Sequence, residues 1–548
     1  SVTVESEPAS SEQIVVLHGQ ADSEAAARAV LLHARSQDPL AVLRTVTQRW
    51  DSLLGAVQIR TPDRALDLLF NRWLLYQTVS SRLWARAGFY QAGGAYGFRD
   101  QLQDGMAVAF AAPALTREHL LRAASRQFRE GDVQHWWHPP SGRGVRTHFS
   151  DDRLWLPFVV HQYIGVSADR GVLDEQVPFL EGAAIPEGHE DAHYVPTVTA
   201  ETASLYEHCA LAMDISLRVG IHDLPLMGGG DWNDGMNRVG LEGRGESVWL
   251  AWFLIDNLRK FAPLAEQRGE TQRAASWRAH ADSLAAACER AGWDGAWYRR
   301  AFFDDGSPLG SADNSECRID SLAQSWAVLS GAADAERAAR AMAAVDDSLV
   351  RGGDGLVLLF TPPFDSALPD PGYIKGYLPG LRENGGQYTH AAIWVLMAHA
   401  ALGDHGQVGT LLDMLNPIRR TESRSGMQAY RVEPYVIAAD IYSCPPHVRR
   451  GGWTWYTGAA GWFHQAILES VLGVRIRGAV LTVTPCMPPN WSGFEVALTR
   501  PGIDYLIRID RVADPAYVGV ELDGVVCAGG RIALLADRLR HVVRVSVV

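Results

Sequence analysis

Residues 228–240, Gly-Gly-Gly-Asp-Trp-Asn-Asp-Gly-Met-Asn-Arg-Val-Gly, combine the side chains that sugar chemistry needs. Asp231 and Asp234 supply carboxyl groups, and Trp232 and Asn233 lie between them. An indole face packs against a sugar ring, an amide bonds to hydroxyls, and a carboxylic acid can protonate the scissile oxygen. The alternative is a capped structural turn, because Asp, Asn and Gly are common in turns. The tryptophan favours a functional site, since a solvated loop rarely contains one.

A second cluster, Tyr-Gly-Phe-Arg-Asp-Gln-Leu-Gln-Asp, spans residues 96–104 and contains Arg99, Asp100 and Asp104. Asp100 as an N-cap and Asp104 in a first helical turn would be a purely structural explanation. That explanation leaves Arg99 unaccounted for, because the fork of donors in a guanidinium suits phosphate or carboxylate. We therefore interpret the cluster as part of a polar binding site.

Two further segments place hydrogen-bond donors at expected helix starts. His390 follows Glu-Asn-Gly-Gly-Gln-Tyr-Thr and precedes an apolar run, and Thr457 and Gly458 follow Trp-Thr-Trp-Tyr. A hydroxyl, an imidazole or free backbone N–H groups at a helix start can bind an anion. Taken alone, the histidine would be structural and the threonine an ordinary N-cap.

Adjacent tryptophans mark a fifth segment, residues 135–144, where Trp136 and Trp137 lie between His135 and His138. Two indoles flanked by polar groups are typical of a sugar platform. The histidine spacing matches no helical zinc motif and no second ligand set is evident, so we predict no metal site.

Composition restricts the class of protein. The chain has 548 residues, is 47% hydrophobic and carries a net charge of −13, which suits a globular protein with a large core. It contains no basic run, so nucleic-acid binding is excluded. The six cysteines are scattered and form no C-x-x-C pair, which predicts reduced, mostly buried thiols and a cytosolic setting. No apolar stretch approaches the ~20 residues of a membrane span, and no signal peptide opens the chain.

Amphipathic helical segments fill the region between residues 21 and 473, with Gly-, Pro- and Trp-rich loops between many of them. This pattern predicts a mainly α protein built as an (α/α) barrel; the alternative α-solenoid would show a fixed repeat. Residues 1–6 and 14–19 look like strands, and we expect the rest of their sheet upstream of this chain. Alternating segments after residue 473, beginning with 474–477, predict a C-terminal β domain.

Together these clusters resemble the inverting β-glycoside phosphorylases of glycoside hydrolase family 94. The matching pieces are YGFRDQLQD, GDWNDGMN, ENGGQYTH and WYTGAAGW, in the family order, and HWWHPPSGRGVRT looks most like the cyclic β-1,2-glucan synthase branch. The resemblance implies an (α/α)6 catalytic barrel over 61–473 and a C-terminal β-sandwich domain over 474–548. It also implies a helical linker over 21–60 and a remnant of an N-terminal β-sandwich over 1–20.

The resemblance also assigns roles to residues. Asp234 would be the general acid, and Trp232 would line the transferred sugar, with Asp100 on its hydroxyls. Asn233, Asp104, Trp136 and Trp137 complete the expected substrate-binding set. Arg99, His390, Thr457 and Gly458 would form a phosphate pocket, with inorganic phosphate as co-substrate and no cofactor.

The expected reaction is phosphorolysis of a β-glucan, β-1,2-linked by resemblance, to α-glucose 1-phosphate. The expected partners are the glucan, phosphate and other domains of a larger parent protein, with a homodimer as one option. The setting would be the cytoplasm, where the chain could be the cytosolic domain of an inner-membrane protein. Two alternatives stay open: an inverting hydrolase with Asp231, Asp104 or Glu383 as base, and a non-catalytic glucan-binding domain.

Overall fold

The computed structural model describes residues 14–500, 502–537 and 539–548, which form two compact units, 1–56 and 57–548. The first unit contains α1 (Glu24–Arg35) and α2 (Pro39–Leu54). Ser23 and Asp38 cap these helices by accepting hydrogen bonds from their first backbone N–H groups. The strand expected at residues 14–19 is not formed among the described residues, where residues 14–20 are irregular. The strand expected at residues 1–6 lies outside the described residues.

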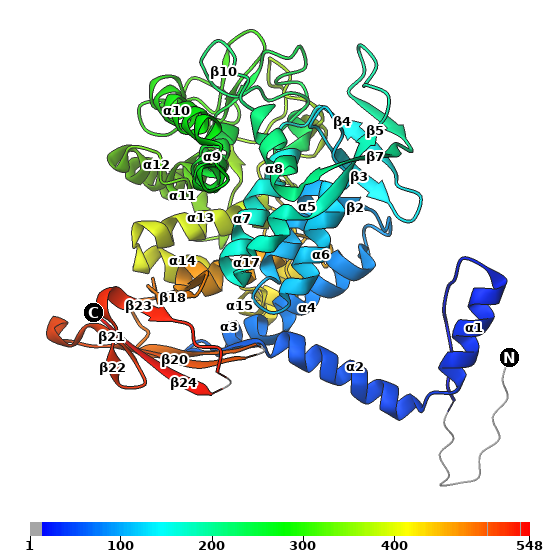
Figure 1. The fold of residues 1–548 in the computed structure, drawn as a ribbon. Helices are drawn as coiled ribbons and strands as arrows, with labels where there is room; N and C mark the ends of the chain where they lie inside the picture. The colour runs from blue at the N-terminus through cyan, green and yellow to red at the C-terminus, as the bar shows by residue number, and fades with distance from the viewer. Residues whose placement is uncertain (1–13, 501, 538) are drawn as a thin grey trace. The chain divides into compact units, whose positions relative to one another are not determined.

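Helices dominate the second unit (Figure 1). Their bounds are α3 (Arg64–Leu68), α4 (Leu75–Gln77), α5 (Phe98–Ala107), α6 (Pro113–Ala124), α7 (Trp155–Ser167), α8 (Leu205–Asp214), α9 (Val248–Gln267), α10 (Thr271–Ala287), α11 (Ser321–Leu329), α12 (Ala335–Ser348), α13 (Thr389–Leu402), α14 (His405–Leu415), α15 (Pro417–Arg420), α16 (Arg424–Tyr430) and α17 (Ala459–Gln465).

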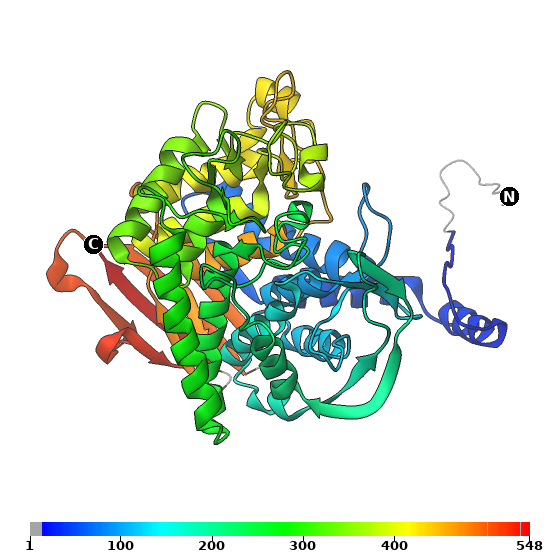
Figure 2. The ribbon, with the colours of Figure 1, turned by 90° about the horizontal axis from the view of Figure 1, so that it is seen from above.

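Alternate helices form a closed ring of contacts that runs from α5 through α7, α9, α11, α13 and α17 back to α5. The helix that follows each ring member often packs on its outer side, as α10 does on α9 and α14 on α13. Figure 2 shows the first of these pairs as two long green helices lying side by side. This inner ring with outer partners is an (α/α)-barrel type of fold.

Tryptophans from the inner helices fill the centre of this ring. Trp394 of α13 has its ring centroid 5.3 Å from that of Trp326, 5.5 Å from Trp462 and 6.4 Å from Trp155 and Trp249. All five side chains are buried, and each comes from a different ring helix. These indoles are therefore core residues, which accounts for part of the high tryptophan content.

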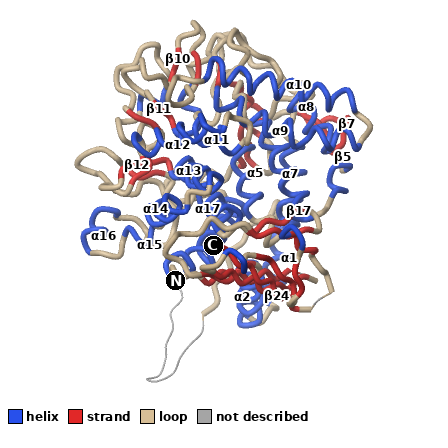
Figure 3. Tube along the Cα trace, turned by 90° about the vertical axis from the view of Figure 1, so that its left-hand side faces the viewer, coloured by secondary structure: helices blue, strands red, loops and turns tan. Residues whose placement is uncertain are grey.

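The C-terminal region forms two sheets, seen as the red strands below the helices in Figure 3. One sheet contains β17 (Val474–Arg477), β18 (Val480–Val483) and β23 (Arg531–Ala533). The other has the order β1-β19-β20-β24-β21-β22, in which β20 (Ile503–Arg511) and β24 (Arg540–Val547) are parallel. Its remaining strands are β19 (Gly493–Arg500), β21 (Gly519–Leu522) and β22 (Val525–Val526).

Residues 57–60, expected as the end of a helical linker, form the edge strand β1 (Val57–Arg60) instead. β1 pairs antiparallel with β19, so residues 57–60 belong to the C-terminal sheet although they precede the barrel in the chain. Its buried Val57 and Ile59 alternate with outward-facing residues, the period of a half-buried strand. Such a pairing between distant segments leaves no local signal in the sequence.

Candidate active site

A cavity of about 410 Å³, here the main cavity, lies at one end of the helical ring. It collects residues from separate parts of the chain, including six that the sequence singled out: Arg99, Asp100, Trp136, Trp232, Asp234 and His390. Trp232 packs its ring edge-on to His390, and its ring centroid lies 5.8 Å from that of Trp394, so these two lining residues rest on the aromatic core of the barrel.

Asp234 is the carboxylate that the Gly-rich loop presents to the main cavity. It begins a short 3-10 turn, Asp234–Met236, in the loop between α8 and α9, and its side chain is 32% exposed. Asn233 caps this turn by accepting a hydrogen bond from the Gly235 N–H at 3.1 Å. The loop therefore holds Asp234 at the cavity wall and keeps the buried Asn233 out of the cavity lining.

Positive groups surround the Asp234 carboxylate. One oxygen pairs with the Arg99 guanidinium, and the other lies 3.7 Å from His135 Nε2. Burial lowers the pKa of His135, but the carboxylates of Asp152 and Asp234 outweigh burial and raise it to about 9. His135 is thus an imidazolium at neutral pH, held by Asp152 at 2.8 Å.

Arg99, the second residue of α5, joins α5 to the Gly-rich loop. Its Nη1 donates to Asp151 Oδ1 at 2.7 Å and to the Asp231 carbonyl oxygen at 2.8 Å, while Nη2 reaches Asp234. Burial opposes the charge, but Asp151 and Asp234 raise the pKa of Arg99 well above its ordinary value. One guanidinium therefore fixes both the loop backbone and the candidate acid.

The other carboxylate of the loop has a structural position. Asp231 is fully buried and accepts two hydrogen bonds from Arg300, at 2.5 and 2.6 Å, and one from Ser247 at 2.7 Å. Burial opposes ionisation, but Arg300 lowers the pKa of Asp231 below its ordinary value. Asp231 lines neither cavity of the site and anchors the loop to α9 and the segment before α11.

A smaller pocket of about 140 Å³, here the anion pocket, adjoins the main cavity and shares Asp100, Gln103 and His390 with it. Thr457 and Gly458, at the start of α17, line it as well. Burial lowers the pKa of His390 to about 3, so its ring is neutral. Its Nε2 has no hydrogen-bond partner among the described residues and is free to meet a ligand.

Arg82, which the sequence did not single out, supplies a cation to the anion pocket. It is buried, lies 4.1 Å from the Tyr456 ring centroid, and donates to Asp104 at 2.9 Å and Asp100 at 3.0 Å. Asp104 is fully buried and lines neither cavity, which corrects the expectation that it contacts the sugar. A lone arginine in an apolar helix carries no motif, so only the fold reveals this group.

Two other expectations change with the geometry. Arg99 lines the main cavity but not the anion pocket, so it faces Asp234 rather than the group around His390. Trp136 lines the main cavity, whereas Trp137 is buried and stacks on Tyr96 with centroids 5.5 Å apart. The two indoles alternate along β3 (Gln134–His138), so only one of them can face a sugar.

The helix cap also contradicts the purely structural explanation of residues 96–104, in which Asp100 would be an N-cap. Gly97, not Asp100, is the N-cap of α5, and both Asp100 and Asp104 lie inside the helix beside Arg82. Their carboxylates accept hydrogen bonds from this arginine and do not cap the helix.

Of the three candidate bases, Glu383 alone lines the main cavity. Burial, the largest cause, raises the pKa of Glu383, and its nearest cation is Arg382 at 3.4 Å. Tyr373 and Tyr377 line the same wall and were not predicted from the sequence.

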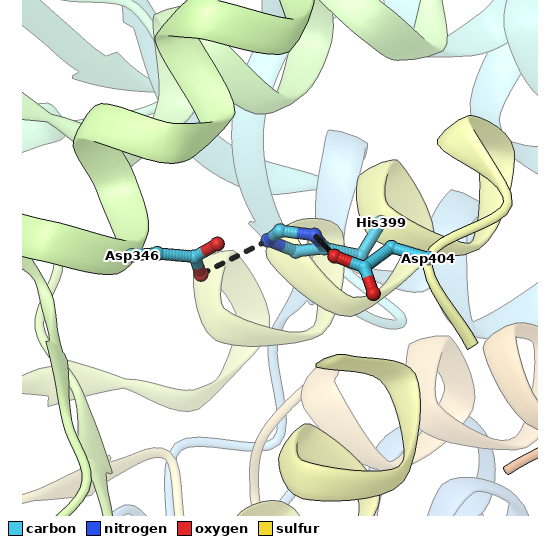
Figure 4. Close-up of side chains that lie close together, drawn as sticks. All are labelled: Asp346, His399 and Asp404. Atoms are coloured by element: carbon cyan, nitrogen blue, oxygen red, sulfur yellow. Dashed lines mark ion pairs between the residues drawn. The ribbon is translucent and has the colours of Figure 1, made fainter. Parts of the chain in front are cut away.

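Away from the site, Asp346, His399 and Asp404 bring potential metal-ligand atoms within 4.8 Å of one another. Figure 4 shows the imidazole lying between the two carboxylates, with Nε2 3.2 Å from Asp346 and Nδ1 3.4 Å from Asp404. A single ion could bind only one ring nitrogen, so this geometry fits an ion-pair bridge from α12 to α13 and α14.

Two further observations concern the cysteines and the lengths of the helices. All six cysteines are free thiols, four of them buried, as their scatter predicted. Among the described helices, none is both long and apolar enough to cross a bilayer.

Comparisons with known proteins agree on the family. Residues 49–473 match the model of the glycosyl hydrolase 94 superfamily catalytic domain. The chain is 49% identical over 500 residues to cyclic beta-(1,2)-glucan synthase NdvB of Rhizobium meliloti, covering 91% of this chain and 18% of that protein. It is 30% identical to the N,N'-diacetylchitobiose phosphorylase of Vibrio furnissii, over 85% of this chain and 59% of that protein.

Another relative, solabiose phosphorylase of Paenibacillus borealis, is 30% identical over 97% of this chain and 66% of its own length. The chain therefore spans less than two thirds of the curated relatives named here. A GH78 family rhamnosidase of Bacillus sp. GL1 has a TM-score of 0.53 at 15% identity, over 83% of this chain and 41% of that one. A bacterial glucoamylase gives 0.51 at 14% identity, over 82% of this chain and 62% of that one. These two similarities concern the fold alone.

Proposed function

Because the chain belongs to the glycosyl hydrolase 94 superfamily, we propose that it is a glycoside phosphorylase that cleaves a β-glucan with inversion and releases α-glucose 1-phosphate. The observation that carries this proposal is the pairing of two adjoining spaces. Asp234 and Trp232 line the main cavity, and Arg82, His390 and Thr457 line the anion pocket beside it.

In this mechanism the sugar lies over Trp232, and Asp234 protonates the oxygen of the bond that breaks. Inverting hydrolysis requires a second carboxylate to activate water, whereas phosphate is already an anion and needs no base. Arg82, the neutral His390 and the Thr457 hydroxyl would hold phosphate behind the anomeric carbon. The burial of Asp104 and the structural use of Asp231 agree with a reaction that lacks a base.

General acid catalysis requires a proton on Asp234, whose carboxyl group contacts the Arg99 guanidinium in this structure. We infer that phosphate and sugar binding draw the Arg99 guanidinium away from Asp234. The bound dianion then compensates the charge of Arg99. Arg99 would in this way serve the phosphate without lining the anion pocket.

The substrate and the setting follow from the relatives rather than from the residues. The 49% identity to a cyclic β-1,2-glucan synthase supports a β-1,2-linked glucan and a role as one domain of such a synthase, where it would control chain length. We also propose that the barrel consists of six helical hairpins. The chain would be a cytoplasmic part of a larger membrane-associated protein, and it could assemble as a homodimer.

Incubation with β-linked glucans, with and without phosphate, tests the proposal. A phosphorylase releases a sugar phosphate only when phosphate is present. Reducing sugar released at the same rate without phosphate would identify a hydrolase, with Glu383 as its base. Binding without products would identify a glucan-binding domain.

A further inference from the structure

A second polar cavity, of about 790 Å³, lies between α14, α15 and residues 488–491, which lead into the C-terminal sheet. We call it the α14 cavity. The two helices lie next to each other in Figures 1 and 3. It shares no lining residue with the main cavity or the anion pocket, so it is a separate space.

Arg420, at the end of α15, is a buried cation in the wall of this cavity. Its exposed fraction is 6%, and Nη2 donates to the Gly355 carbonyl oxygen at 2.6 Å and to Gln387 Oε1 at 3.3 Å. Both acceptors are neutral. Its Nε has no hydrogen-bond partner among the described residues, and none of their carboxylates forms an ion pair with it.

No carboxylate is among the described groups that shift the pKa of Arg420. Burial, the largest cause, lowers this pKa to about 10; Tyr430 acts against burial, and the neighbouring cation Arg449 acts in the same direction as burial. Arg449 lines the same cavity. A buried charge without a counter-ion is costly, and arginine keeps its proton at neutral pH, so the surroundings of Arg420 favour an anionic ligand.

The carboxylates of the cavity are already engaged by the neighbouring arginine. Arg419 donates to Asp63 at 2.7 Å and to Glu422 at 2.7 Å, and lies 3.6 Å from Asp413. Three carboxylates therefore surround Arg419, whereas none of the described carboxylates pairs with Arg420. This contrast is the second observation that points to a missing ligand.

We propose that the α14 cavity binds the phosphate group of a small ligand between Arg420 and Arg449. Guanidinium groups match phosphate oxygens in geometry and form charge-assisted hydrogen bonds with them. The cavity is several times larger than the anion pocket, and Asn490 and Trp491 also line it, so it has room for a sugar attached to the phosphate. A phosphorylated sugar fits this space better than free phosphate.

The site is independent of the proposed reaction, yet it has a link to the active site. Gln387, which accepts a hydrogen bond from Arg420, directly precedes Tyr388 in β15 (Gln387–Tyr388). Tyr388 lines both the main cavity and the anion pocket.

Equilibrium dialysis of the whole chain with inorganic phosphate, glucose 6-phosphate and neutral glucose tests the proposal. Arg449→Gln is the main variant, because Arg449 is only half-buried, and its circular dichroism is compared with that of the wild type. Arg424→Gln, which removes an exposed charge near the cavity without lining it, is the matched control. Arg420→Met is a second variant, accepted only if its circular dichroism matches the wild type.

We expect Arg449→Gln to weaken one phosphate-binding site by about 10- to 150-fold, the effect of one charge-assisted hydrogen bond, while Arg424→Gln leaves it unchanged. Glucose 6-phosphate should bind more tightly than phosphate, and glucose should not compete. Equal affinity for the two phosphates would still support the site and would assign free phosphate as the ligand. Unchanged stoichiometry and affinity in both Arg449→Gln and Arg420→Met would overturn the proposal.

The same assay separates this site from the anion pocket. If both bind phosphate, Arg449→Gln reduces two sites to one. If the anion pocket does not bind, the same variant reduces one site to none, so the failure of the proposed function is distinguishable from the failure of this inference.

Discussion

Replacing each carboxylate of the Gly-rich loop by asparagine should affect a different property, stability for one residue and activity for the other. Asp231 is buried with Arg300 and accepts two short hydrogen bonds from it, whereas Asp234 is 32% exposed and faces the main cavity. The substitution is chemically the same at both positions and changes the volume little. Any difference between the variants therefore reports the surroundings of each residue.

For Asp231→Asn we expect a loss of about 3–5 kcal/mol in the free energy of unfolding, because Arg300 stays buried without its partner. Asp320, whose carboxylate lies 3.5 Å from Arg300 Nε, offsets part of the unpaired charge of Arg300, so the expected loss of stability lies near the lower end of this range. For Asp234→Asn we expect a loss of at most about 1 kcal/mol, as for a partly exposed ion pair. Its kcat should instead fall by about 10²–10⁴-fold, the usual contribution of a general acid.

The assay combines urea unfolding, followed by tryptophan fluorescence, with initial rates on a β-1,2-glucan in phosphate. Rates are compared at a temperature where both variants are folded. If Asp231→Asn is as stable as the wild type, Arg300 does not depend on this carboxylate and the anchoring argument is wrong. If Asp234→Asn retains nearly full activity, Asp234 is not the acid.

Three other predictions follow from the site. In the Arg82→Lys variant, the lysine cannot bridge Asp100 and Asp104 as a guanidinium does, so the KM for phosphate should rise by about 10- to 100-fold with little change in the KM for glucan. Equal changes in the two KM values would show that Arg82 does not bind phosphate. Because the pKa of His135 is raised to about 9, its contribution to stability is fully present below pH ~6.5 and is lost as the pH rises through about 9. His135→Gln should flatten this fall in melting temperature between pH 6.5 and 9, and an unchanged profile would contradict the assignment. Trp136→Ala should raise the KM for glucan by about tenfold, whereas an unchanged KM would show that this indole does not contact the sugar.

The sequence predicted those parts of the site in which several informative residues are adjacent. The Gly-rich loop between two helices and Trp136 of β3 carry local signals, namely turn residues and an aromatic pair. Outside the site, period-2 alternation marks the start of β17 at Val474. It also placed Trp232, Asp234 and His390, which the fold brings to one cavity.

The sequence could not predict contacts between distant segments. Arg82 and Arg300 belong to no motif that the sequence reveals, and their importance depends on the carboxylates that the barrel brings to them. The pairing of β1 with β19 is equally invisible, because alternation identifies a strand but not its partner. The burial of Asp104 was missed because an acidic residue in a polar cluster usually faces solvent.

The configuration of the first product tests the central claim most directly. The chain is mixed with a β-1,2-glucan and phosphate, and the first sugar phosphate is followed by proton NMR before it can equilibrate. The account predicts α-glucose 1-phosphate, formed in proportion to phosphate and absent from the Asp234→Asn variant. A β-configured phosphate ester, or free glucose released at the same rate without phosphate, would contradict it.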